Sequence, residues 1–120
     1  QAVIAGYDFL VLPSRYDGWG VVVNESVLAG VPVLCSEGVG AGAFLRRWHC
    51  GMFFRPFSVE ALAASLRTLA TDLPLRERLR AACLASRDRL APQVAGRYMS
   101  EVITRGLSLD GRIANPWYDA

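Results

Sequence analysis

The first half of the chain alternates short apolar runs with segments rich in glycine. These runs contain almost no polar residue, which is typical of strands buried on both faces of a parallel sheet. Pro13 closes the first run, and Gly30 stands where a glycine commonly ends a helix. The predicted elements are a strand at 7–12, a helix at 21–29, a strand at 31–35, one or two helical turns within 43–49 and a strand at 52–54.

In the second half the apolar residues take helical spacing. The predicted helices are one that begins at Ser58, a second at 73–90 and a third from Pro92 to about Arg105, followed by an irregular tail at 108–120. In the second helix, the positions expected to face the core are Leu75, Leu79, Ala82, Cys83 and Ser86. Those expected to face water are Arg76, Arg78, Arg80, Arg87 and Arg89.

The order strand, helix, strand, loop, strand and then helices predicts an α/β fold, half of a parallel sheet with a helical C-terminal cap. A chain of 120 residues suffices for one compact unit, and 52% hydrophobic against 20% charged residues excludes disorder. The longest stretch without a charge, residues 26–36, is too short to span a bilayer. The chain starts at Gln1 without an initiator Met, so we expect a piece of a longer protein.

Charge and cysteine usage exclude several classes of function. The formal net charge is +2, and no basic run is longer than two residues, so no nucleic-acid interface is expected. Cys35, Cys50 and Cys83 share no close spacing and lie among apolar residues. We expect buried thiols in a reducing cytoplasm rather than disulfides or a zinc site. His49 is the single histidine, so neither a His-based metal cluster nor a Ser-His-Asp triad can be assembled.

Residues 14–25 (SRYDGWGVVVNE) carry the strongest candidate site. The segment leaves a predicted strand and turns into a helix, so its backbone N–H groups and the positive helix end suit a phosphate. Gly18 and Gly20 let a ligand approach the backbone, and the carboxylates of Asp17 and Glu25 can accept hydrogen bonds from vicinal sugar hydroxyls. The alternative is structural: Asp17 would serve the turn, and Glu25 would favour the helix N-terminus through the dipole.

The longer string LPSRYDGWGVVVNESVLAGVPVLCS resembles the nucleotide-sugar-binding signature of the family 4 glycosyltransferases (glycosyl transferases group 1), retaining enzymes of the GT-B fold. Their E-x7-E motif is matched by Asp17, seven intervening residues and Glu25. The resemblance continues through VGAGAFL, MFF and the later helices, and covers about 100 of the 120 residues. In one departure, the family usually has Glu where this chain has the shorter Asp17, which leaves the identity of the transferred sugar open.

The resemblance implies a role for each residue of the loop. Glu25 would hold the ribose hydroxyls of the nucleotide, and Asp17, the implied catalytic residue, would hold a hydroxyl of the transferred sugar. The backbone at Gly18 and the amides of Trp19, Gly20 and Val21 would meet the sugar and the diphosphate. No metal ligand and no cofactor is implied, because the nucleotide diphosphate sugar is itself the substrate.

The resemblance also implies that residues 1–107 are part of a nucleotide-sugar-binding Rossmann-like domain, the C-terminal, donor-binding side of a GT-B enzyme. That enzyme would transfer a hexose to a saccharide or lipid-linked acceptor in polysaccharide or glycolipid biosynthesis. The missing N-terminal domain and the basic residues that stabilise the leaving diphosphate would lie upstream, so these residues alone would be inactive. We expect a bacterial cytoplasmic protein, peripheral to the inner membrane. The alternatives are a nucleotide-sugar epimerase of the same fold and a non-catalytic nucleotide-binding or assembly module.

Other features have both a functional and a structural interpretation. Residues 38–43 satisfy the G-x-G-x-x-G/A dinucleotide pattern, but the next strand follows too soon for a crossover helix, so a loop is expected. The Arg-rich helix could contact anionic lipid, but its interleaved acids favour a solvated face. Arg15 is either a charge partner near the site or a solvated loop residue. The aromatic residues that could stack on a base, but are expected in the core, are Trp48, Phe53, Phe54 and Phe57.

Overall fold

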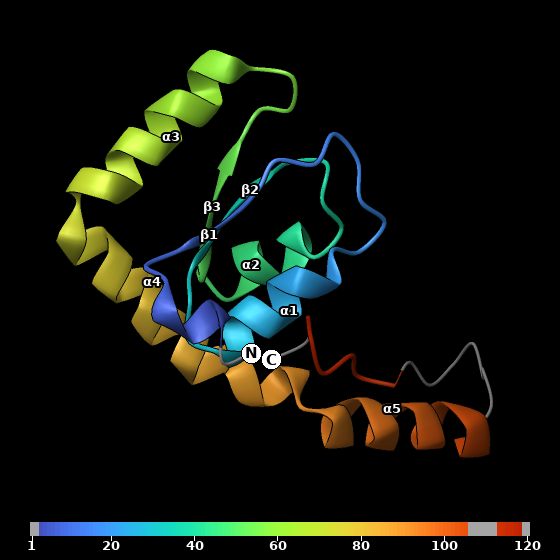
Figure 1. The fold of residues 1–120 in the computed structure, drawn as a ribbon. Coiled ribbons are helices and arrows are strands. Elements are labelled where there is room, and N and C mark those ends of the chain that lie inside the picture. The colour runs from blue at the N-terminus through green and yellow to red at the C-terminus, as the bar shows by residue number, and fades with distance from the viewer. Residues whose placement is uncertain (1–2, 106–112, 119–120) are drawn as a thin grey trace.

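The computed structural model describes residues 3–105 and 113–118, and these contain a three-stranded parallel sheet with helices packed against it (Figure 1). The strands are β1 (Leu10–Leu12), β2 (Val33–Ser36) and β3 (Gly51–Phe54), in the order β1-β2-β3. Val33 pairs with Leu10 on one side and with Gly51 on the other. Parallel neighbours need crossover connections, which helices supply here. The predicted α/β fold is therefore confirmed.

The helices form a layer on each face of the sheet. Helices α1 (Val21–Leu28) and α2 (Gly42–Arg47) connect the strands and cover one face, and α3 (Val59–Thr71) covers the other (Figure 1). Helix α4 (Leu73–Ser86) continues into the 3₁₀ turn η2 (Arg87–Leu90), and α5 (Pro92–Arg105) extends away from the sheet. A 3₁₀ turn, η1 (Ile4–Gly6), precedes β1. Within the described ranges, no helix is long and apolar enough to cross a membrane.

Strand β2 lies at the centre of the core. All of its residues are buried, and successive side chains point to opposite faces, as the pleat requires. Val33 and Cys35 join the apolar cluster under α1 and α2, whereas Leu34 joins a second cluster with Leu69 and Leu79 under α3 and α4. The prediction of a strand buried on both faces is correct for β2.

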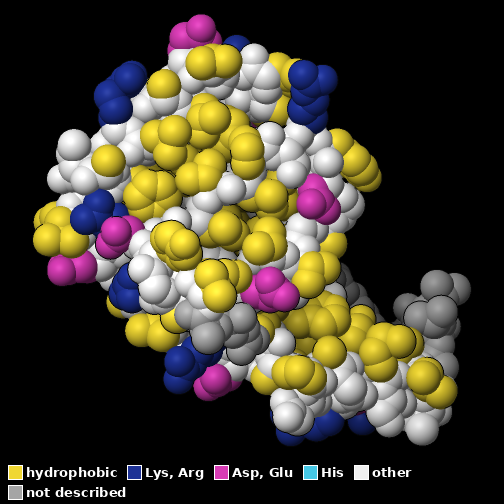
Figure 2. Space-filling view, viewed as in Figure 1, with side chains coloured by type: hydrophobic (Ala, Val, Ile, Leu, Met, Phe, Trp, Pro, Cys, Tyr) yellow, Lys and Arg dark blue, Asp and Glu magenta, His cyan; other side chains and the backbone are white. Residues whose placement is uncertain are grey.

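Strand β1 is shorter and less buried than its sequence predicts. The apolar run suggested a strand at 7–12, but β1 begins at Leu10, and Tyr7 is 62% exposed. Residues Leu10–Leu12 are only half-buried, because within the described chain β1 has a neighbouring strand on one side alone. In Figure 2, hydrophobic side chains gather over the middle of the molecule, where the sheet lies in the same view of Figure 1.

Local signals mark the helix ends. The Ser58 hydroxyl accepts a hydrogen bond from the Ala61 backbone N–H, and the Asp72 carboxylate accepts one from that of Leu75. Each side chain satisfies a donor that the first turn of a helix leaves unpaired. Helix α1 ends just before Gly30, whose φ of +73° is the left-handed conformation typical of a glycine after a helix.

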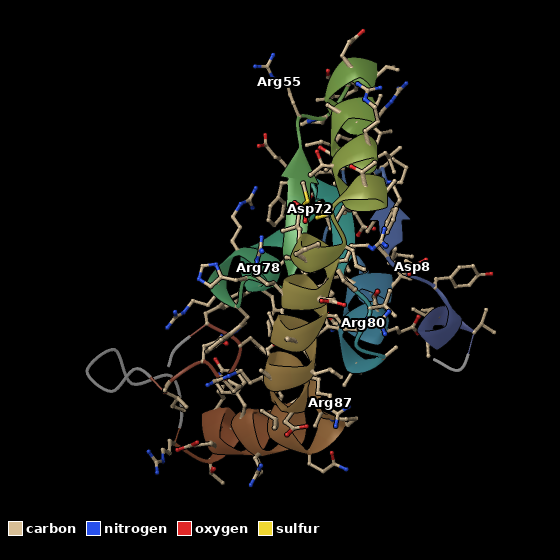
Figure 3. The ribbon with its side chains drawn as sticks, turned by 90° about the vertical axis from the view of Figure 1, so that its left-hand side faces the viewer. Asp8, Arg55, Asp72, Arg78, Arg80 and Arg87 are labelled. Carbon is tan, nitrogen blue, oxygen red and sulfur yellow. The ribbon has the colours of Figure 1, made fainter. Side chains whose placement is uncertain are left out.

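The sequence predicts that the arginines of α4 and η2 face water, but in the structure two of them contact other parts of the chain. Arg76 donates to the carbonyls of Leu69 and Ala70 at the end of α3, at 2.7 and 3.0 Å. The Arg89 guanidinium lies over the Trp48 ring, 3.8 Å from its centroid. Figure 3 shows Arg78 and Arg80 on opposite sides of α4, so these guanidinium groups do not form one basic face.

Residues 113–118, part of the predicted irregular tail, pack against the body of the molecule. Three side chains donate to three successive carbonyls of this segment. Arg89 of η2 donates to Pro116 at 3.2 Å, Trp48, which directly follows α2, donates to Trp117 at 2.8 Å, and Arg47 of α2 donates to Tyr118 at 3.0 Å. The rest of that predicted tail, residues 108–112 and 119–120, lies outside the described residues.

We predict that Gly30→Ala lowers the free energy of unfolding by about 1–3 kcal/mol, because an alanine would be strained at this φ. Its Cβ would also lie 2.7 Å from the Leu84 Cδ2 atom. The control is Gly96→Ala in α5, where no atom lies within 4 Å of the added Cβ and where alanine should stabilise the helix by about 0.5–1 kcal/mol. Urea unfolding followed by circular dichroism measures both changes. Equal stability of the two variants would contradict the assigned role of Gly30.

Candidate functional site

Three loops meet at one edge of the sheet. Parallel strands end at the same edge, so residues 13–20 after β1, 37–41 after β2 and 55–58 after β3 leave it together. Helix α1 begins directly after the first of these loops. In open α/β sheets, ligands bind outside the carboxyl ends of the strands. The residues that the sequence singled out therefore lie at the edge where a ligand is expected.

The loop after β1 is held against the loop after β2 by backbone hydrogen bonds. The Asp17 N–H donates to the Gly38 carbonyl at 3.1 Å, and the Gly40 N–H donates back to the Asp17 carbonyl at 3.0 Å. The Ala41 N–H then donates to the Trp19 carbonyl at 2.7 Å. These bonds extend the parallel pairing beyond the sheet and give the first loop a fixed shape.

This pairing explains the glycine spacing of residues 38–43. A Cβ at Gly38 would lie 2.5 Å from the Arg15 carbonyl oxygen, and one at Gly40 would lie 2.2 Å from that of Gly18. Both distances are too short for any side chain. The glycines therefore allow a second backbone to approach, and α2, with six residues, is the short element expected here in place of a dinucleotide-binding crossover helix.

Asp17 takes part in the loop's own structure. Its carboxylate oxygen Oδ1 accepts a hydrogen bond from the Trp19 backbone N–H at 3.1 Å, which is an Asx turn. The side chain is half-buried. An ionised carboxylate has about four lone-pair sites, so this bond leaves capacity for a ligand hydroxyl. The structural interpretation of Asp17 is correct, and it is compatible with the binding role.

Gly20 sets the direction of α1. It is the residue before the helix, it is buried, and its φ is +85°. A Cβ there would lie 2.9 Å from Val39 Cγ1 and 3.2 Å from Leu12 Cδ2. No side chain caps this helix end, and although the Val23 N–H donates to the Gly20 carbonyl at 2.9 Å, the N–H groups of Val21 and Val22 remain available. Val21, the first residue of the helix, is 65% exposed, which leaves the helix end open to a ligand.

Glu25 lies in the middle of α1 with an exposed side chain. Among the described residues it forms no ion pair and no side-chain hydrogen bond. Since the first turn of α1 contains no acidic residue, Glu25 is too far along the helix for the dipole interaction considered from the sequence. That structural interpretation is wrong, because the helix begins at Val21.

Two polar residues of the site were missed in the sequence. The buried Ser36 hydroxyl donates to the Ser14 carbonyl and accepts from the Gly38 N–H, which ties the two loops together where β2 ends. Asn24 accepts a hydrogen bond from the Trp19 indole at 3.3 Å. A serine that ends a buried apolar strand was the available signal for the first, whereas nothing local pointed to the second.

Clefts adjoin the loop after β1. One, of about 380 Å³, is lined by Trp19, Asn24, Leu90, Ala95 and Trp117. Another, of about 300 Å³, includes Arg15, Phe54 and Phe57 in its wall. Arg15 is exposed, and its guanidinium lies 5.4 Å from the centroid of the Phe57 ring.

The four aromatic residues expected in the core have different environments. Phe54 is buried, and Trp48 and Phe53 pack against the core while partly exposed. Phe57 contradicts the expectation: it is 77% exposed and has a φ of +63° in the turn that leads to α3. Its position after Pro56 places it beyond the strand, where it has no core to join.

Metal-ligating side chains do not gather at this edge. In the described part of the chain, no three His, Cys, Asp or Glu residues lie close enough together to hold a metal ion. The chemistry available here is hydrogen bonding from backbone amides, two carboxylates and the positive end of a helix.

A parallel sheet with helices on both faces, whose C-terminal edge presents a glycine-led helix N-terminus, is the architecture of Rossmann-like α/β proteins. Comparison with known proteins is more specific. The family model for glycosyl transferases group 1 matches residues 1–83, and the chain belongs to this family.

Several relatives support this assignment. The chain is 35% identical over 75 residues to the lipopolysaccharide glucosyltransferase WaaG of Escherichia coli, covering 62% of this chain and 20% of that protein. It is 35% identical over 71 residues to a glycogen synthase of Mycobacterium tuberculosis, covering 59% and 17%. The crystal structure of WaaG superimposes with a TM-score of 0.73 at 28% identity, over 87% of this chain and 28% of that one. The GT-B fold expectation is confirmed, and the chain spans about a fifth of the length of these curated relatives.

We predict that Gly40→Ala lowers the free energy of unfolding by about 1–3 kcal/mol, because the added methyl group forces the two loops apart. Gly18→Ala is the matched control in the facing loop. No atom lies within 4 Å of its added Cβ, so its effect should stay within about 0.5 kcal/mol. Denaturant unfolding of both variants gives the comparison, and a Gly40→Ala protein as stable as Gly18→Ala would contradict the loop pairing.

Proposed function

We propose that these residues are the donor-binding part of a retaining glycosyltransferase that transfers a sugar from a nucleotide diphosphate sugar to an acceptor hydroxyl. The observation that carries this proposal is the fixed loop from Asp17 to Gly20, which delivers an uncapped helix N-terminus to the carboxyl edge of the sheet. Membership of the glycosyl transferase group 1 family supports it. Relatives named as glucosyltransferase and glycogen synthase suggest that the product is a polysaccharide or glycolipid.

Different groups of the loop and of α1 would bind different parts of the donor. The amides of Gly20 and Val21 and the positive end of α1 would bind the diphosphate, because helix N-termini favour anions. Asp17 would accept a hydrogen bond from the transferred sugar through capacity left by its turn. Glu25, exposed further along α1, would hold the ribose hydroxyls. Each role uses a donor or acceptor that has hydrogen-bonding capacity left among the described residues.

Transfer itself would need groups beyond these residues. As the bond to the sugar breaks, negative charge develops on the leaving diphosphate, and preorganised positive groups lower the barrier by stabilising it. The helix end supplies part of this stabilisation. We propose that the remaining cationic groups and the acceptor site belong to another part of the polypeptide, as the greater length of the relatives suggests.

We predict that UDP, GDP or ADP contacts the full-length protein and that Glu25→Gln weakens this binding roughly 10- to 100-fold. That range corresponds to the loss of hydrogen bonds to a charged acceptor. The matched control is Glu37→Gln, another exposed acid, in the loop that follows β2, which should leave affinity unchanged. Saturation-transfer NMR and calorimetry measure the binding. If none of the three nucleotides binds the wild-type protein, the proposed function is wrong.

A second prediction distinguishes the proposed role of Asp17 toward the sugar from that of Glu25 toward the nucleotide. Asp17→Asn keeps an oxygen that can accept from the Trp19 N–H, so the turn should persist while the charged acceptor for the sugar is lost. We expect the Asn variant to lower affinity for UDP-glucose, or for the glucose conjugate of whichever nucleotide binds, with the free nucleotide unaffected. Asp17→Ala removes the turn as well, so it should weaken both ligands. Equal losses for both ligands in the Asn variant would show that Asp17 has no separate role toward the sugar.

A further inference from the structure

Residues 113–118 run back beside α5 to the body of the molecule, and their own side chains give them a defined shape (Figure 1). The Asn115 side-chain oxygen accepts a hydrogen bond from the Trp117 N–H at 2.9 Å, and the Asn115 carbonyl accepts one from the Tyr118 N–H at 3.2 Å. Pro116 follows Asn115, at the position of a turn that its fixed φ favours. The segment therefore contains a preformed turn, which can dock as a unit.

Three side chains hold this segment by its backbone. Arg47, Trp48 and Arg89 each donate to one of its carbonyls. The guanidinium groups also contact the indole: the Cζ atom of Arg89 lies 3.8 Å from the centroid of the Trp48 ring, and that of Arg47 lies 4.9 Å from it. Such cation–π contacts restrict the orientation of the donors. Because Arg47 ends α2 and Arg89 belongs to η2, the segment joins two elements that are far apart in sequence.

The Trp117 side chain and the loop before α1 share a cleft. Trp117 lines the cleft of about 380 Å³ together with Trp19 and Asn24. Both indoles also pack against the same apolar cluster in the core. On the other side, the Trp117 ring meets the Tyr98 ring of α5 edge-on, with 5.5 Å between the centroids. Trp117 thus contacts α5 and forms one wall of a cleft whose opposite wall belongs to the candidate site.

The 3₁₀ turn η2 connects the segment to α1. Arg89 of η2 donates to the segment, and η2 packs directly against α1. Leu90, the last residue of η2, lines the same cleft as Trp19. Since α1 begins at Val21, directly after the loop, a movement of α1 would also move its first turn and the end of that loop.

We propose that residues 113–118 form a strap that holds the start of α1, and with it the loop from Asp17 to Gly20, in the shape described for the candidate site. The strap is held largely by hydrogen bonds from exposed and partly buried side chains, so it can be released without unfolding the core. Release would remove the Trp117 wall of the cleft and one support of η2. The loop should then open more often, because local opening follows the contacts that hold a region.

For ligand binding, this inference rests on the proposed function. If the loop and the start of α1 bind the diphosphate, a docked strap favours the shape that binds it. Nucleotide binding must then favour docking of the strap to the same extent, because the coupling between two sites is reciprocal. The strap itself needs no contact with the nucleotide to have this effect.

Hydrogen exchange of the full-length protein, followed by mass spectrometry, tests the strap without any ligand. Arg47→Met removes one donor to the strap. Arg46→Met is the matched control, because Arg46 is also exposed on α2 but lies over the Phe53 ring. In Arg47→Met we expect exchange to accelerate about 5-fold in residues 113–118, as for one lost hydrogen bond, and at least about 2-fold in residues 17–23. Exchange in α3, on the other face of the sheet, should not change.

A second variant acts on the same strap from another donor. Trp48→Phe keeps an aromatic ring for the arginines but loses the indole N–H, so it should accelerate exchange in the same two regions. Circular dichroism checks that both variants are folded. The proposal is overturned if residues 113–118 exchange faster while residues 17–23 do not, or if neither variant accelerates exchange in residues 113–118.

The same measurement with UDP, GDP or ADP distinguishes this proposal from the proposed function. In the wild-type protein, a nucleotide that binds should slow exchange in residues 113–118 as well as in residues 17–23. Protection of residues 17–23 alone would contradict the coupling. If none of the three nucleotides binds, the proposed function is wrong, and the exchange of the ligand-free variants still decides whether the strap holds the loop.

Discussion

The candidate site depends on two backbones that run side by side with no room for a side chain between them. Residues 17–19 exchange three hydrogen bonds with residues 38–41, and the carbonyl of Gly18 occupies the space that a side chain at Gly40 would need. This pairing fixes Val39 against Gly20, and Val39 and Leu12 in turn leave room for glycine alone at that position. The left-handed conformation of Gly20 then aims the first turn of α1 at the edge of the sheet. The orientation of the helix N-terminus therefore follows from packing between loops that belong to different strands.

The sequence predicts those parts of the fold that short-range patterns determine. Strand β2 is fully buried, and its uninterrupted apolar run could have no other place in a protein of this size. Gly30 and Ser58 act through their own backbone or through a residue three positions away, so their roles can be recognised without the structure. The E-x7-E spacing is local in the same sense, because a loop and one turn of helix connect its two acids.

Features that depend on distant partners could not be predicted. Arg89 was expected in water, and only the folded chain brings Trp48 and Pro116 to its guanidinium. Strand β1 has the composition of a buried strand, but burial requires neighbours on both sides, and its sequence cannot show them. The glycines at 38–43 are a different case. Their spacing suits either a phosphate or a second backbone, and only the carbonyl that lies 2.2 Å from the would-be Cβ of Gly40 decides between them.

Asp17 shows how the fold can account for a departure from the family pattern. Where glutamate is usual, this chain has aspartate, and its carboxylate accepts from the N–H two residues ahead. That geometry is characteristic of short side chains, because one methylene places the oxygen next to the neighbouring backbone. A glutamate would reach further toward a ligand but would not stabilise this turn in the same way. The shorter acid thus has less reach but makes the loop more rigid, and in the proposed donor-binding role a sugar hydroxyl would have to approach closer to the backbone of Trp19.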